Sequence, residues 1–158
     1  MRNGTFDYNQ PNTIAMILTI LLATISSTTL MTILSYLFSA TFRELYKEPL
    51  LLKYLMQRFG SPLSANSEEM VGWVAHYAIG LLFVLCFQIL LHFDILSISW
   101  TSGLLFGTAA GLIGIGWWHT MFQLSNFPPI DFKGYYWQLL VVHIIFGLTT
   151  AAVYKVLA

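Results

Sequence analysis

Charge is what this sequence has least of. Only 9 % of its 158 residues are Asp, Glu, Lys or Arg, whereas soluble proteins average roughly 25 %. Hydrophobic residues make up 57 %, so water is not the main solvent of the chain. The formal net charge is zero and the sequence has no basic cluster, which argues against nucleic acid as a partner.

Cysteine and catalytic motifs are scarce as well. Cys86 is the only cysteine, so an intrachain disulfide is excluded. The sequence contains no Gly-x-Ser-x-Gly, no glycine-rich phosphate loop with a lysine and no His-Glu-x-x-His. Enzymatic activity is therefore possible only through residues that folding brings together, and the sequence leaves it open.

Long uncharged stretches are abundant. They lie between Asp7 and Arg43, Glu69 and Asp94, Asp94 and Asp131, and Lys133 and Lys155. Each stretch can hold the roughly 20 apolar residues that cross about 30 Å of hydrocarbon, and a chain surrounded by lipid must satisfy its backbone as a helix. We therefore predict an all-α membrane protein, with residues 1–158 forming a single transmembrane domain that is a four-transmembrane-helix bundle. The spans are expected at about 11–42, 67–92, 99–124 and 134–157, the first being retained because residues 1–10 do not resemble a cleaved signal.

The connection after the first span has a pattern of its own. Glu48-Pro49 can begin a helix, and the segment 49–59 alternates apolar residues with Lys53 and Arg58. This composition suits a short interfacial helix in the headgroup layer, although a plain connector is the alternative. Asn66 and Glu69 have the spacing of a capping box and predict the start of the second span.

Basic residues are distributed unevenly among the connections. Arg43, Lys47, Lys53 and Arg58 lie in the first connection and Lys133 in the third, whereas the second has neither Lys nor Arg. The positive-inside rule then places connections one and three in the cytoplasm and both termini outside.

Small residues predict how the helices pack, because close backbone approach and interhelical hydrogen bonds drive association in lipid. Glycines recur at four-residue spacing in the third span, and hydroxyl residues form one stripe along the first. The packing residues we expect are Gly103, Gly107 and Gly111, then Thr28, Thr32, Ser35 and Ser39, and finally Gly80 and Gly147.

Histidines are the main ionisable residues inside the spans, where such groups usually face the bundle interior. His76 and His143 each lie roughly 14 Å from the proposed cytoplasmic edge, and His119 lies about one turn shallower. The three can ligate a transition metal, with Glu44, Glu48 or Glu69 as a possible carboxylate partner.

Other roles for the same histidines remain open. His76 and His143 can be the two axial ligands of haem b, with Gly80 and Gly147 leaving room for the macrocycle. They can instead hydrogen-bond a neighbouring helix, including the hydroxyls of the first span, or take part in proton or solute movement.

A short pattern occurs twice. His-x-x-x-Gly appears at His76–Gly80 and again at His143–Gly147. Two parallel helical-hairpin repeats would place the two histidines at matching depth.

The same residues carry a resemblance. With Gly72-Trp73 before His76-Tyr77 and Gly80, and with His143 and Gly147 near the C-terminus, the chain resembles uncharacterised YagU-like four-span proteins of the bacterial inner membrane. The segments 32–49 and 126–131 look like versions of this type from Bacteroidetes. The resemblance implies the cytoplasmic membrane of a bacterium and supplies no known activity.

Three functions follow as hypotheses. The first is a membrane subunit or scaffold that packs against other spans, or against copies of itself as a homo-oligomer, through its glycine and hydroxyl faces. The second is a bundle that binds a metal or haem through its histidines. The third is a small transporter or proton-linked carrier, which requires a cavity reaching His76 or His143.

Overall fold

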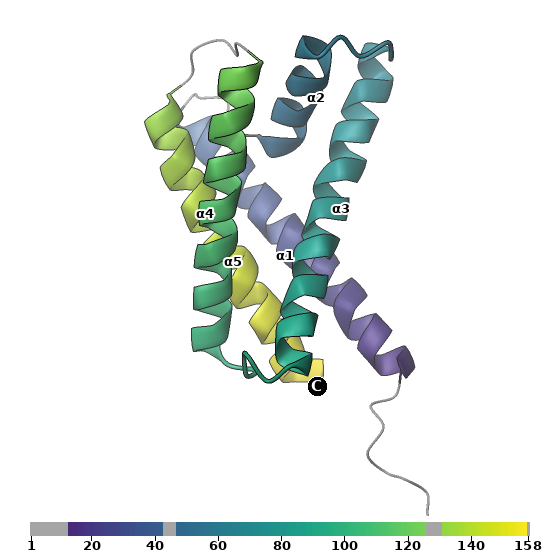
Figure 1. Cartoon of the computed structure of the whole chain (residues 1–158), viewed down its shortest axis with the longest axis vertical. Coiled ribbons are helices and arrows are strands. Elements are labelled where there is room, and N and C mark those ends of the chain that lie inside the picture. Colours follow the sequence, from purple (N-terminus) through teal and green to yellow (C-terminus); the bar gives the residue numbers. More distant parts are fainter. Residues whose placement is uncertain (1–12, 43–46, 126–130, 158) are drawn as a thin grey trace, which may run out of the picture.

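The computed structural model describes residues 13–42, 47–125 and 131–157, and it is all-helical over these ranges (Figure 1). The helices are α1 (Thr13–Phe42), α2 (Glu48–Arg58), α3 (Ala65–His92), α4 (Trp100–Leu124) and α5 (Phe132–Leu157). The all-α prediction is confirmed, and each expected span corresponds to a helix whose bounds differ by two residues or fewer within the described ranges.

Three of these helices, α1, α3 and α5, are long and apolar enough to cross a membrane. We expected four, and α4 is the difference. It has 25 residues, but its five glycines and three tryptophans are spread along it, and no stretch of α4 reaches the hydropathy of the other three helices, because neither residue is as apolar as Leu or Ile. The chain therefore has the character of a membrane protein, with three long helices apolar enough to cross a membrane and α4 below that level.

The four long helices alternate in direction, so α3 and α5 run the same way (Figure 1). Extensive packing joins α4 to α5, α1 to α5, α2 to α3 and α1 to α3. The consecutive helices α3 and α4 do not pack against each other in this way.

The start of α3 differs from the predicted capping box. Helix begins at Ala65, two residues earlier than expected, and Ser64 is the cap because its Oγ accepts a hydrogen bond from the backbone N–H of Ser67. Asn66 lies inside the first turn, so it is not the cap. Serine in an extended conformation is a favoured N-cap, and Ser99 caps α4 in the same manner.

The segment predicted after the first span is a helix, α2, and not a plain connector. It runs antiparallel to α3: residues nearer the N-terminus of α2 contact residues further along α3. Gln57 bonds Glu68, Lys53 pairs with Glu69, and the carbonyl of Pro49 lies where a Cβ of Gly72 would be. This order of contacts carries the N-terminus of α2 into the bundle.

Candidate functional site

A cavity of about 400 Å³ lies in the half of the bundle that contains α2. All five helices contribute to its wall, which is mostly apolar and includes the ionisable residues Glu48, His76 and His143. The side chains of Leu82 on α3 and Ile113 on α4 line the cavity and are also more than half exposed. The cavity therefore reaches the outer surface between α3 and α4.

The opening between α3 and α4 is closed at both ends. Towards the C-terminal end of α3, Phe87 meets Phe106 of α4 with ring centroids 5.1 Å apart. At the α2 end, the Arg58 side chain donates a hydrogen bond to the Ser125 carbonyl that follows α4, at 3.0 Å. The space between these two contacts is a window in the side of the bundle.

Glu48 is the first residue of α2 and is 3 % exposed. Its Oε1 accepts hydrogen bonds from Ser35 of α1 at 3.1 Å and from Gln138 of α5 at 3.4 Å. Ser35 lies seven residues before the end of α1 and Gln138 six residues after the start of α5, so the carboxyl group sits roughly 10 Å inside the bundle.

The second oxygen of Glu48, Oε2, is buried and has no hydrogen-bond partner among the described residues. Burial raises the pKa of Glu48 from 4.5 to about 7, against the opposing effect of the hydrogen bonds from Ser35 and Gln138. A carboxyl group with this pKa exchanges a proton near neutral pH. An unsatisfied buried oxygen is costly, and it calls for a proton, a water or a ligand.

His76 is fixed by α1. Its Nε2 lies 2.9 Å from the Thr32 hydroxyl, which itself donates a hydrogen bond to the Thr28 carbonyl at 2.6 Å. A hydroxyl has one hydrogen, so His76 Nε2 carries the proton in its bond to Thr32. The unprotonated Nδ1 of His76 then has no partner among the described side chains.

His143 is fixed by its own helix and not by α1. Its Nδ1 lies 2.8 Å from the Leu139 carbonyl, which can only accept, so Nδ1 carries the proton. Its Nε2 is left as an acceptor next to Gly114, at 3.5 Å from the position that a Cβ there would take. Both Gly114 and His143 line the cavity.

The predicted packing faces are used inside the chain. Thr28, Thr32, Ser35 and Ser39 are all buried, and Thr28 packs directly on Gly80 of α3. The glycines of α4 do not meet this hydroxyl stripe. They meet α5, where Gly103 and Gly107 lie against Gly147 and the backbone at His143, and Gly111 lies against Leu140.

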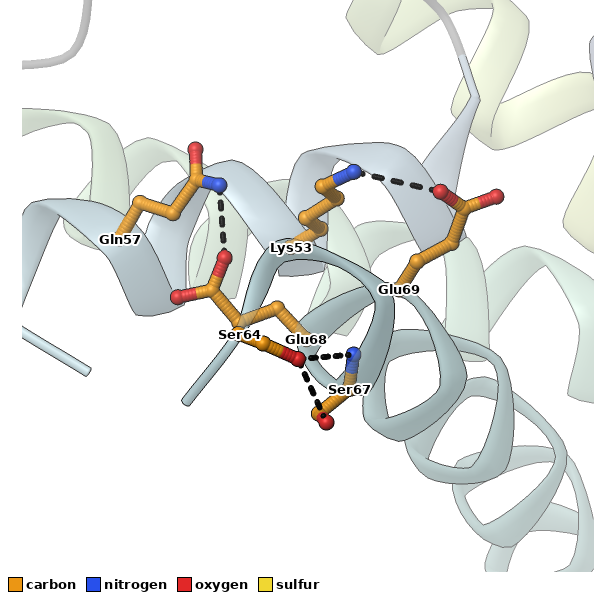
Figure 2. Close-up of polar contacts among 6 residues, drawn as sticks. All are labelled: Lys53, Gln57, Ser64, Ser67, Glu68 and Glu69. Carbon is orange, nitrogen blue, oxygen red and sulfur yellow. Dashed lines mark hydrogen bonds and ion pairs between the residues drawn. The ribbon is translucent and has the colours of Figure 1, made fainter. Parts of the chain in front are cut away.

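The proposed metal donors are dispersed. His119 is exposed, and its Nδ1 lies 3.2 Å from the Tyr136 hydroxyl. Glu69 is exposed and pairs with Lys53 at 3.2 Å (Figure 2). Glu44 lies outside the described residues, as do Arg43 and the loop at 126–130. Over the ranges that the structure describes, no group of three or more His, Cys, Asp or Glu is placed to hold a metal ion.

Polar contacts hold α2 to the start of α3 (Figure 2). Gln57 donates a 2.6 Å hydrogen bond to the buried Glu68, one turn from the Lys53–Glu69 ion pair. Leu51 and Leu55, on the inner face of α2, pack in a cluster that includes Trp118. These contacts fix Glu48 at the inner end of α2.

Sequence reasoning missed Gln138. It named Glu48 only as one of three possible metal partners, because nothing in the local sequence indicates that α2 enters the bundle. A signal for Gln138 was present, since it is an uncharged polar residue within an otherwise apolar helix and such residues usually bond across helices.

Comparison with known proteins adds no relative: no family model, no curated protein and no solved structure matches this chain.

Proposed function

We propose that this protein binds a small lipid-soluble molecule that enters its cavity sideways from the bilayer, between α3 and α4. One observation carries the proposal: a largely apolar cavity of about 400 Å³ is lined by Glu48, a buried carboxyl group whose Oε2 has no hydrogen-bond partner among the described residues. Ligand sites are typically apolar cavities of about 300–1,000 Å³ with a few well-placed polar groups. This cavity meets the requirement that the carrier hypothesis set, because both His76 and His143 line it.

The proposal includes the arrangement of the chain in the membrane. We place α4 as a fourth span, since it packs along α5 and its 25 residues are about 37 Å long. The basic residues Lys47, Lys53, Arg58 and Lys133 favour a cytoplasmic location for the α2 end, with both termini outside. The resemblance to YagU-like proteins favours a bacterial inner membrane. The cavity then lies in the cytoplasmic half.

Two observations favour ligand binding over the other hypotheses. The glycine and hydroxyl faces that would serve a scaffold are covered by helices of the same chain, so binding to other subunits or to a second copy would have to use lipid-facing residues instead. Haem ligation through His76 Nε2 would compete with the bond from that nitrogen to Thr32, and the third histidine proposed for a metal site, His119, is exposed elsewhere.

Photolabelling tests the proposal. The protein in bilayer nanodiscs would be exposed to a diazirine derivative of octanol, and the adducts mapped by mass spectrometry with and without excess octanol. We expect octanol-protected adducts at the window, on residues such as Ile113 and Trp117. Adducts spread over all lipid-facing helices, with no protection by octanol, would refute the proposal.

Two glycine variants provide a matched control. Gly114 lines the cavity and a Cβ there makes only ordinary contacts, the nearest at 3.5 Å, whereas a Cβ at Gly116 meets nothing within 4 Å. Gly114→Leu should fill the cavity and abolish the protected adducts, while Gly116→Leu should leave them unchanged. Equal labelling of the two variants would contradict the proposed site.

A further inference from the structure

The described wall of the cavity has an acidic group without a basic counterpart. Glu48 contributes a carboxyl group, and no lysine or arginine is among the described residues of the wall. Two cations close to Glu48 in the sequence are engaged elsewhere, since Lys53 pairs with Glu69 and Lys47 Nζ lies 4.7 Å from the centre of the Tyr36 ring. Among the described wall residues an anionic ligand would find no formal positive charge.

The two histidines add to this negative character. The proton of His143 is on Nδ1, bonded to the Leu139 carbonyl, and that of His76 is on Nε2, bonded to Thr32. Each imidazole therefore keeps one nitrogen lone pair that no described protein group uses. Such lone pairs attract a cation or a hydrogen-bond donor.

Aromatic rings make up much of the remaining wall. Phe83, Trp117, Trp118 and Phe146 all line the cavity, and they come from three helices. The face of an aromatic ring carries negative charge density and attracts organic cations, most strongly when both are removed from water. The same rings receive the apolar body of a ligand.

We propose that the ligand is a small organic cation with an apolar body, and that its charge is bound by the carboxylate of Glu48. This inference rests on the proposed function, and it specifies the chemical class of the molecule. A lipophilic cation can enter through the window from the bilayer, because its charge is spread over or shielded by hydrocarbon. In the cavity the cation lies against Glu48, whose Oε2 has no hydrogen-bond partner among the described residues.

Cation and proton then compete for the same carboxylate. Burial raises the pKa of Glu48 to about 7, so below neutral pH the cation must displace one proton, which leaves to solvent. The titratable groups facing Glu48 are Tyr36 on α1, His76 on α3, and Tyr135 and His143 on α5. Among described residues, α4 contributes no titratable group to the cavity wall.

A pair of isosteric ligands tests the inference. Benzyltrimethylammonium is a permanent cation, and neopentylbenzene is its uncharged carbon counterpart. Binding of each to the purified full chain would be followed by tryptophan fluorescence, since Trp117 and Trp118 line the cavity. We expect the cation to bind roughly tenfold more weakly at about pH 6 than at about pH 8, following the ionised fraction of Glu48, and the neutral ligand to bind equally at both.

Variants assign the effect to Glu48. Glu48→Gln should weaken cation binding by more than about tenfold and remove its pH dependence, without changing the binding of neopentylbenzene. Glu69→Gln removes a carboxylate from the same end of the protein and should change neither the binding of the cation nor its pH dependence. Glu48→Asp keeps the charge and should retain the pH dependence of cation binding. If Glu48→Gln fails to fold, the binding of the two ligands to the unmodified protein at the two pH values still tests whether the site prefers a cation.

The outcomes separate this inference from the proposed function. If both ligands bind equally well and neither responds to pH or to Glu48→Gln, the cavity binds neutral molecules and the inference is overturned. If neither ligand binds saturably, and octanol-protected photolabelling also fails, the proposed function itself is refuted.

Discussion

Two pairs of consecutive helices in this protein are joined in opposite ways. Between α4 and α5, glycine meets glycine, and the backbones are so close that a Cβ on Gly103 would lie 2.7 Å from the Gly147 carbonyl oxygen. Between α3 and α4, large side chains such as Leu82 and Ile113 line the gap, no glycine of one helix makes its closest contacts with the other, and the backbones stay apart around a cavity. In lipid, leucine gains little by packing on protein, so facing glycines close one interface, while the other stays open.

The largest effect is expected from a substitution that forces the α4–α5 interface apart. At Gly107 a Cβ would lie 2.8 Å from the Ile144 Cα and closer still to the His143 carbonyl oxygen, and these backbone atoms cannot move aside. We expect Gly107→Ile to cost about 3 kcal/mol or more, measured as the loss of the folded form in detergent by thermal unfolding and size exclusion.

The control for this change lies on the same helix. A Cβ at Gly116 meets nothing within 4 Å, so Gly116→Ile should leave the melting temperature within a few degrees of the unmodified protein. An equal loss of stability in the two variants would show that α4 and α5 are not held by close glycine contact.

The second prediction concerns the polar side of the cavity. The folded pKa of Glu48 is about 7 and the ordinary value is 4.5, so the folded protein holds a proton that the unfolded chain has released between these pH values. The contribution of Glu48 to stability is therefore complete below about pH 4.5, declines as pH rises to about 7, and is lost above it. Because Gln cannot ionise, Glu48→Gln should be the more stable protein at about pH 8, by a few kcal/mol at most.

Melting curves of both proteins between about pH 4 and pH 8 test this expectation. Glu69→Gln is the matched control, since Glu69 is about half exposed and should show no such divergence. A constant offset between Glu48→Gln and the unmodified protein across the range would mean that Glu48 is already ionised in the fold.

A smaller effect is expected from the hydrogen bond that fixes one wall of the window. His76→Phe removes the bond to Thr32 that joins α3 to α1, and buried interhelical bonds in membrane proteins are worth about 0.6–2 kcal/mol. His119→Phe removes an exposed contact to Tyr136 and should cost less than about 0.5 kcal/mol. Chemical unfolding would rank the two, and the reverse order would argue that His76 is not a structural link.

The smallest effect is expected at the α2 end of the window, where Arg58 contacts Ser125. Arg58→Ala removes the bond to the Ser125 carbonyl, which bridges the α2–α3 and α4–α5 pairs, at an expected cost of about 1 kcal/mol or less. Hydrogen exchange should rise in α2 and at the end of α4 more than after Lys53→Ala, which affects only the α2–α3 contact. Equal exchange in the two variants would show that Arg58 does not hold the two helix pairs together at the α2 end of the window.

Hydrophobicity and spacing were sufficient for the helices themselves. The long uncharged stretches gave every long helix, and the four-residue glycine spacing identified residues that do lie at a close interface. The same reasoning did not identify which helix each of these faces meets, because a stripe of small residues indicates that a neighbour comes close without indicating which helix it is. It also assigned the cap of α3 to Asn66 instead of Ser64, since both precede the apolar run and only the backbone conformation distinguishes them.

The apolar composition requires the chain to coil into long helices, because lipid leaves backbone polar groups no other partner. How these helices pack then sets the inward turn of α2, the convergence of Ser35 and Gln138 on Glu48, and the cavity between α3 and α4. Composition could not predict this packing, because the apolar runs are similar to one another. Which helices meet is set by the fit of small side chains and by a few buried hydrogen bonds between residues up to 123 positions apart.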